Sequence, residues 1–286
     1  MKPCQLCPCD QLTPPAPAAR FSLKAYQTRI AATLFSGKMD ASQRACIGGF
    51  TAAAALLIHM GHDIPIQHLA YVLATTYHET AFTMRPVREY GQGEGYPYGE
   101  PDPATGETYY GRGYVQLTWK DNYARMSEKV VSILLEPVDL VSKADYALAP
   151  AYAAQIAVIG MSEGIFTGKK LSDYWLANGE YDYTEARRII NGTDRAETIA
   201  GYAAEFELAA RLVQGQPIER NTVKMGSKGA DVAELQLALG SAEVDGAFGN
   251  NTDALVKAFQ SANGLTANGV ADQTTWEALE KQVYGL

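Results

Sequence analysis

The sequence lacks three features, each of which would assign it to a broad class of protein. Its 286 residues contain no uninterrupted run of the ~18 apolar residues that a membrane span needs, so we expect no membrane insertion. It has no excess of positive charge, because 24 Lys and Arg stand against 32 Asp and Glu. A general nucleic-acid binder would carry a basic face, so we expect no nucleic-acid partner. Nor is it poor in apolar residues, which make up 47% and predict a globular chain of one or two domains.

The N-terminus also lacks a secretory signal, which would need a basic start and an apolar core of ~7–15 residues. We therefore expect the protein to be made in the cytoplasm and to leave it by other means. The tail carries Cys4, Cys7 and Cys9, which with Cys46 offer four thiols to zinc. The alternative is a tail of reduced thiols, which we favour because structural zinc sites usually combine two ligand pairs. No other metal-binding motif such as H-E-x-x-H occurs, so we expect no metal and no cofactor.

Composition divides the chain into four segments. These are a Cys/Pro-rich tail (1–20), a large domain (21–214), a linker (215–228) and a small domain (229–286). Helical spacing of apolar residues predicts a mainly α fold, and the 64–80 helix is apolar on nearly all sides, as a buried helix is. Helices are expected near 40–60, 64–80, 123–135, 147–164, 195–214, 231–239, 251–262 and 274–282.

Residues 84–113 interrupt this pattern. They contain seven glycines and five tyrosines, which predicts loops with a small hairpin rather than a helix. Loops of this length are often functional.

A carboxyl group stands at the end of the 64–80 helix, in the string His78-Glu79-Thr80. Glu79 follows Thr76 by three residues and Val72 by seven, so these side chains share one face. An apolar face would raise the pKa of the Glu79 carboxyl. A carboxylic acid that stays protonated can donate its proton to a leaving oxygen, although a solvated glutamate at a helix end is the alternative.

Glycoside hydrolysis needs a second carboxyl on the other side of the scissile bond. Glu89, ten residues later in the glycine-rich loop, is one candidate. Glu94, Glu100 and Glu107 compete with it, and spacing alone leaves the choice open.

The string YYGRGYVQLTWKDNY follows at 109–123. Arg112 can pair with a carboxylate and hold it in place. Gln116 and Asn122 suit sugar hydroxyls and N-acetyl groups. Trp119 and Tyr123 either stack on sugar rings or belong to the core.

The chain carries H-E-T at 78–80, Y-Y-G-R-G-x-x-Q-L-T-W-x-x-N-Y at 109–123 and I-I-N-G at 189–192, in that order. Over roughly 40–210 it thereby resembles glycoside hydrolase family 19, which includes plant-type chitinases and many phage lysozymes. The resemblance implies a lysozyme-like α-helical catalytic domain with Glu79 as general acid, Glu89 as general base and Thr118 beside the catalytic water. It implies inversion, for which the two carboxyls lie ~6.5–9.5 Å apart. Roles in binding substrate or organising the carboxylates are implied for His78, Tyr110, Arg112, Gln116, Asn122, Tyr123 and Asn191.

The last sixty residues carry a D-G-A-F-G turn at 245–249 and the string F-Q-S-A-N-G-L at 259–265. Over roughly 222–280 they resemble the peptidoglycan-binding domain of the bacterial three-helix type. The resemblance implies a small three-helix bundle that holds cell-wall material. Asp245, Phe248, Gly249 and Asn250 lie on the loop we expect to contact it.

Together the two resemblances predict a lysozyme, an endo-β-N-acetylmuramidase that cuts the β-1,4 bond between N-acetylmuramic acid and N-acetylglucosamine of bacterial peptidoglycan. The alternatives are a chitinase acting on β-1,4 N-acetylglucosamine polymers and a non-catalytic wall-binding protein. We expect a monomer that acts on the wall in the periplasm. A phage endolysin would have a holin as its partner, whereas an interbacterial effector delivered by a secretion system would have an immunity protein.

Overall fold

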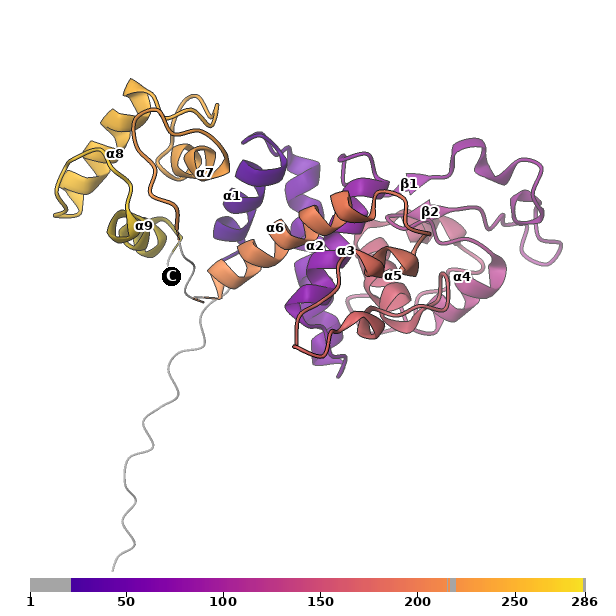
Figure 1. Cartoon of the computed structure of the whole chain (residues 1–286). Helices are drawn as coiled ribbons and strands as arrows, with labels where there is room; N and C mark the ends of the chain where they lie inside the picture. The colour runs from indigo at the N-terminus through magenta and orange to yellow at the C-terminus, as the bar shows by residue number, and fades with distance from the viewer. Residues whose placement is uncertain (1–21, 215, 217–219, 285–286) are drawn as a thin grey trace, which may run out of the picture.

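The computed structural model describes residues 22–214, 216 and 220–284. The predicted tail, with Cys4, Cys7 and Cys9, lies outside this part of the chain. Within it, nine α-helices and one two-stranded sheet form, so the fold is mainly α as predicted. Two separate hydrophobic cores, one between Ala25 and Val213 and one between Val223 and Leu279, divide it into a first domain and a C-terminal domain. Figure 1 shows the C-terminal domain beside α1, at the end of the first domain opposite to the loop that follows β1.

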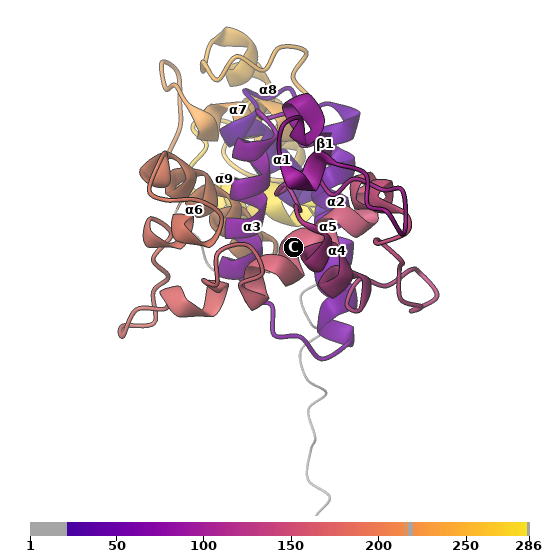
Figure 2. The ribbon, with the colours of Figure 1, turned by 90° about the vertical axis from the view of Figure 1, so that its right-hand side faces the viewer.

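Six helices build the first domain. Among them α3 is buried at nine of its fourteen positions, which confirms the prediction of a buried helix over 64–80. It packs against α6 and α5, and α5 also packs against α2 (Figure 2). The six are α1 (Leu23–Leu34), α2 (Ala41–His59), α3 (Ile66–Glu79), α4 (Lys120–Ser127), α5 (Pro150–Glu163) and α6 (Ala196–Val213).

The helix α2 begins at a capping box. The Asp40 carboxylate accepts from the Gln43 amide at 2.8 Å, and the Gln43 side chain accepts from the Asp40 amide at 2.7 Å. By length and composition alone α2 is apolar enough to cross a membrane. Its inner face, with Ile47, Phe50 and Leu57, is completely buried in the first core, as in a core helix of a globular domain.

Two short strands frame the glycine-rich segment. β1 (Val87–Arg88) and β2 (Arg112–Gly113) are antiparallel, with Val87 opposite Gly113. This is the small hairpin that the sequence predicted. Because the strands pair, the loop between them returns to the end of β1 and is closed at its base.

The helix predicted over 123–135 is too long. α4 ends at Ser127, and a tight turn follows in which Val131 pairs with Pro137. The Ser132 hydroxyl accepts from the amides of Leu134 and Glu136, which satisfies the turn locally. Pro137 disfavours a helical backbone at the residue before it, so the apolar spacing does not continue as a helix.

Three helices build the C-terminal domain: α7 (Ala230–Ala238), α8 (Asn250–Ala262) and α9 (Gln273–Leu279). Its core surrounds Trp276, whose indole nitrogen donates to the Asn221 carbonyl at 3.1 Å. Val223 belongs to this core and pairs with Ala271. The domain therefore begins within the segment that was predicted as a linker over 215–228.

Candidate active site

Glu79 is the last residue of α3, and its carboxylate is bound by an arginine from a distant segment. Arg187, in a 3-10 turn (Glu185–Ile189), donates from Nη1 to Glu79 Oε1 at 2.6 Å. The Arg187 side chain is 3% exposed and that of Glu79 is 25% exposed. Arg187 Nε also donates to the Asp194 carbonyl at 3.0 Å. The arginine is thus held firmly, and it fixes a carboxylate that remains open to solvent on one side.

The expectation of a purely apolar face around Glu79 is therefore wrong, because a cation supplies one side of its surroundings. Sequence reasoning missed Arg187, which lies 108 residues from its partner. The available signal was its position just before the I-I-N-G string. Asn191 of that string is exposed, and its amide donates to the Arg187 carbonyl at 3.0 Å. His78, the neighbour of Glu79, is half-buried, and its Nδ1 is buried with no hydrogen-bond partner among the described residues.

Glu89 follows β1 directly and is held by two donors. Its Oε2 accepts from the Gly111 amide at 2.9 Å, and its Oε1 accepts from the Tyr98 hydroxyl at 3.1 Å. Its own amide donates to the Gly111 carbonyl at 2.7 Å, which extends the pairing of β1 with β2. The carboxylate therefore has a fixed position in a loop region that would otherwise leave it free.

The three competing glutamates have no such support. Glu94 and Glu100 are exposed, and Glu107 is half-buried. None of the three side chains accepts a hydrogen bond from another described residue. Among the four candidates the structure therefore positions Glu89 best, although its role as the base stays a prediction.

An aromatic row lies beside Glu89. The rings of Tyr96 and Tyr98 stack with centroids 5.2 Å apart, and Trp119 meets Tyr98 edge to face at 4.9 Å. Backbone hydrogen bonds from Tyr109 to Tyr98 and from Trp119 to Tyr109 tie the three segments together. Tyr96 is 57% and Trp119 50% exposed, so both side chains are open to solvent. Sequence reasoning left Trp119 open and did not single out the two tyrosines.

The close return of the loop depends on two glycines. The backbone of Gly99 lies against the Gly93 carbonyl so tightly that a Cβ at Gly99 would collide with it. Gly93 has φ +77°, a conformation that favours glycine. This contact brings Tyr98 back toward Glu89 and explains part of the glycine content of the segment.

Arg112 supports the site from inside rather than facing substrate. It is buried, donates from Nε to Asp145 Oδ1 at 2.9 Å and lies 3.6 Å from the centroid of the Tyr110 ring. Its Nη1 also donates to the Tyr123 hydroxyl at 3.1 Å. Tyr110 is 5% exposed and Tyr123 is fully buried. The substrate-binding roles expected for Arg112, Tyr110 and Tyr123 are therefore not direct contacts, because the core covers these side chains.

Gln116, Thr118 and Asn122 stabilise the turn between β2 and α4. The Gln116 backbone has φ +58°, and its side-chain nitrogen donates to the Val87 carbonyl at 3.3 Å. The Thr118 hydroxyl donates to the Gln116 carbonyl at 2.9 Å, and Asn122 Nδ2 donates to the Thr118 carbonyl at 2.9 Å. Thr118 is half-buried and its hydroxyl oxygen can still accept a hydrogen bond, so its role beside a water stays a prediction.

Three of the four residues expected to contact the wall are accessible, and the fourth is buried. Asp245, Gly249 and Asn250 line a cavity of about 290 Å³ in the C-terminal domain. Phe248 is 2% exposed and belongs to the core of this domain, so its expected contact with the wall is wrong. The D-G-A-F-G string therefore forms a turn, and its phenylalanine packs in the core of the domain.

Three comparisons with known proteins bear on these features. Residues 228–279 match the family model of a putative peptidoglycan binding domain. This confirms the resemblance of the C-terminal domain. No curated protein matches the chain.

Two solved structures are similar to the larger part of the chain. A bacterial family 19 chitinase shares 21% identity over 70% of this chain and 98% of its own, with a TM-score of 0.46. Chitinase C from Streptomyces griseus HUT6037 shares 19% identity over 70% of this chain and 72% of its own, with a TM-score of 0.36. The first belongs to the family that the motifs resemble. Because both TM-scores are below 0.5, the function is argued below from this chain's own residues.

Proposed function

We propose that the protein is a glycoside hydrolase of the bacterial cell wall, a lysozyme that cleaves the β-1,4 bond between N-acetylmuramic acid and N-acetylglucosamine. The observation that carries the proposal is the position of the Glu89 carboxylate at the edge of an exposed aromatic row. Aromatic faces stack on the apolar faces of sugar rings, and a neighbouring carboxylate then meets the bond between two sugars. The peptidoglycan-binding C-terminal domain supports the wall rather than chitin as the polymer.

The proposed reaction uses the two carboxyl groups in different protonation states. Glu79, protonated, gives its proton to the glycosidic oxygen as the bond from that oxygen to the anomeric carbon breaks. Glu89, ionised, takes a proton from a water molecule whose oxygen attacks the same carbon from the opposite face. The new hemiacetal has the inverted configuration, and the two glutamates exchange protonation states before the next turnover.

Hydrogen bonds from neighbouring residues fix the position of each carboxyl group. Hydrogen bonds from the Tyr98 hydroxyl and the Gly111 amide hold Glu89 in a fixed position. A general base needs such a position because it must take its proton from one particular water molecule. Glu79 is fixed through Oε1 by Arg187, and its Oε2 accepts no hydrogen bond from the described residues. The second oxygen is the one we assign to proton donation.

The C-terminal domain would raise the local concentration of the enzyme on an insoluble polymer by a second attachment. Such attachment matters here because the chain carries a net charge of −8 and gains no long-range attraction from an anionic wall. We therefore assign affinity to short-range contacts of this domain.

The test compares two substitutions on purified sacculi. Glu79→Gln and Glu89→Gln are expected to lower the rate of turbidity loss by about 10²-fold or more each, because each removes one proton transfer. Glu94→Gln, an exposed glutamate of the same loop, is the matched control and should retain activity. Normal activity in Glu79→Gln would refute the acid assignment.

Product analysis identifies the bond. Mass spectra of digested sacculi are expected to show muropeptides with a reducing-end muramic acid, whereas anhydro products would indicate a lytic transglycosylase. Release of reducing ends from chitin oligomers but not from sacculi would make the protein a chitinase. Binding to sacculi without any cleavage would leave only the wall-binding function.

The setting that we propose is delivery to the wall from the cytoplasm. A neighbouring holin gene would identify an endolysin, and a neighbouring gene for an exported immunity protein would identify an interbacterial effector.

A further inference from the structure

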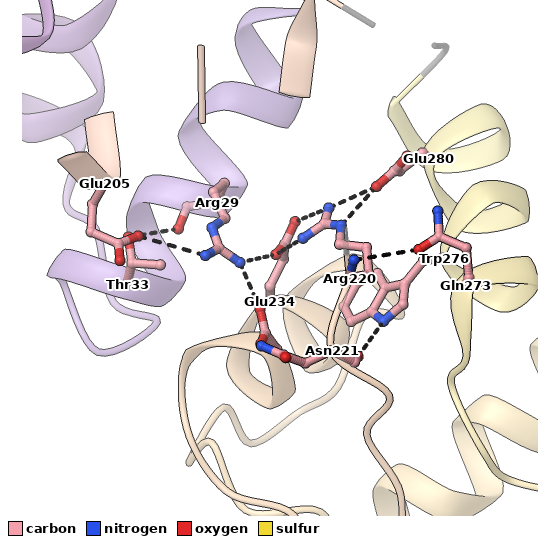
Figure 3. A network of polar contacts seen from close by, with 10 residues as sticks. Arg29, Thr33, Glu205, Arg220, Asn221, Glu234, Gln273, Trp276 and Glu280 are labelled. Carbon is pink, nitrogen blue, oxygen red and sulfur yellow. Dashed lines mark hydrogen bonds and ion pairs between the residues drawn. The ribbon is translucent and has the colours of Figure 1, made fainter. Parts of the chain in front are cut away.

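The C-terminal domain is docked on α1 by an ionic network that is buried between the two domains (Figure 3). Arg29 of α1 donates from Nη1 to Glu234 Oε2 and to Asp231 Oδ1, both at 2.8 Å. Arg220 binds Glu234 from the other side through two hydrogen bonds of 2.8 and 3.1 Å. Glu234 is completely buried. One carboxylate is therefore shared by two guanidinium groups, one from each domain.

Apolar contacts extend the docking beyond this network. Leu237 and Ala238 of α7 pack against the core of the first domain. In the turn after α1, Gly37 has φ +76° and lies so close to Val244 that any Cβ there would collide with the valine side chain. The two domains therefore meet at two places, one on α1 and one at the turn that follows it.

A cavity of about 620 Å³ lies between these two contacts. The first domain contributes Ala32, Ser36 and Lys38 to its lining. The C-terminal domain contributes the rest, which are Lys228, Gly229, Ala233, Val244, Asp245, Gly246 and Ala247. Neither domain could form this cavity alone, because each provides only one side of it.

The charged groups of the cavity are available to a ligand. Lys38 and Lys228 are exposed and form no ion pair with any described residue, whereas many other cations of the chain do. Asp245 Oδ1 accepts from the Ala247 amide at 2.9 Å and from Gln236 Nε2 at 2.8 Å. Hydrogen bonds from the Ala247 amide and then from the Gln236 side chain lower the pKa of the Asp245 carboxyl. Two ammonium groups and one carboxylate suit a ligand with carboxylates and an amino group.

We propose that this cavity is a composite binding site, shared by both domains, for a carboxylate-bearing stem peptide of peptidoglycan. The inference rests on the proposed function, because it takes the wall as the substrate. Lys38 and Lys228 would bind peptide carboxylates, and Asp245 would accept a peptide ammonium group. A peptide held here is fixed relative to the core of the first domain, at the end opposite to the loop that follows β1.

The test measures binding of the full-length protein to intact sacculi at 4 °C by co-sedimentation. Lys38→Ala and Lys228→Ala are each expected to weaken binding about fivefold, the loss of one charged contact. Lys24→Ala in the first domain and Lys224→Ala in the C-terminal domain are the matched controls. Both lysines are exposed, lie outside the cavity and change the net charge equally. The controls are expected to bind like the unmodified protein.

A second arm identifies the ligand group. Amidation of the peptide carboxylates removes the partners of both lysines. Amidated sacculi are therefore expected to bind the unmodified protein more weakly than native sacculi bind either the Lys38→Ala or the Lys228→Ala variant. Equal binding by all four lysine variants, or equal loss in variants and controls, would overturn the composite site while the proposed function stands. Failure of the unmodified protein to bind any sacculi would instead remove the proposed function as well.

Discussion

Arg187 binds the Glu79 carboxylate and fixes its position. Removing Arg187 tests whether this contact acts on the catalytic step or on substrate binding. Arg187→Ala is expected to lower kcat about 10²-fold with little change in KM, because an aligned charged donor is lost at the reacting group. Steady-state kinetics on a soluble peptidoglycan oligosaccharide measure both quantities. Arg187→Lys keeps the charge and should restore part of kcat.

Arg188 supplies the control for this experiment. It is the next residue in the same turn, and it forms an ion pair with Glu185 at 2.7 Å on the surface. Arg188→Ala should leave kcat and KM unchanged. An Arg187→Ala variant that melts like the unmodified protein and keeps full kcat would show that Arg187 does not position Glu79.

For individual residues, the sequence predicted candidate site residues better than it predicted the contacts that these residues make. Glu89 is distinguished from its competitors only when the Gly111 amide is seen to bind it. Phe248 looked like a loop residue and is a core residue, because the D-G turn sends the chain directly back into the domain. Arg187 was missed because ion pairs between distant segments follow from the folded chain and leave no local spacing.

The helix α3 carries a second polar residue with a predictable effect on stability. His68 is 6% exposed among Trp175 and Tyr181, and both ring nitrogens lack a hydrogen-bond partner among the described residues. Burial lowers the pKa of His68 from 6.5 to about 4, and the nearby Asp63 opposes this only in part. The unfolded chain therefore takes up a proton near pH 6.5 that the native protein takes up only near pH 4.

Burial of His68 makes the protein less stable as the pH falls. Above pH 6.5 the imidazole is neutral in both states and has no effect on pH dependence. Between pH 6.5 and about 4 the unfolded state binds a proton at His68 and the native state does not. The free energy of unfolding therefore falls by up to about 3 kcal/mol as the pH decreases through this range. Urea denaturation at several pH values, compared between the unmodified protein and His68→Leu, measures this loss. His59→Leu, at an exposed position of α2, should follow the unmodified protein. A constant difference between His68→Leu and the unmodified protein across this range would contradict the assignment.

Elements with a strong apolar pattern were predictable, and elements fixed by side-chain hydrogen bonds were not. The bounds of α3 agree closely with the predicted 64–80 because apolar residues surround it until the last turn. α4 ends eight residues earlier than predicted, where Ser132 and Pro137 impose a turn. The aromatic row depends on the contact between Gly93 and Gly99, which no periodicity reveals.

On the scale of the whole molecule, the docking of the two domains keeps the proposed glycan site apart from the peptidoglycan-binding domain. The loop that carries Glu89 and the C-terminal domain lie at opposite ends of the first domain (Figure 1). The sequence predicted two domains joined by a linker but gave no sign of their docking. The partners of Arg29 in the C-terminal domain, Asp231 and Glu234, are more than 200 residues away in the chain.

The ionic network predicts different outcomes for its two arginines. Arg29→Met removes only the cation from the first domain, and Arg220 still neutralises Glu234, so the C-terminal domain should stay folded but separate from α1. Small-angle X-ray scattering should then show a larger radius of gyration, and calorimetry should show two transitions in place of one.

Arg220→Met removes a cation that also binds Glu280, and it should destabilise the C-terminal domain itself by about 3–5 kcal/mol. Arg44→Met, at an exposed position of α2, should change neither measurement. An unchanged radius of gyration in Arg29→Met would mean that the apolar contacts of α7 and Gly37 suffice for docking.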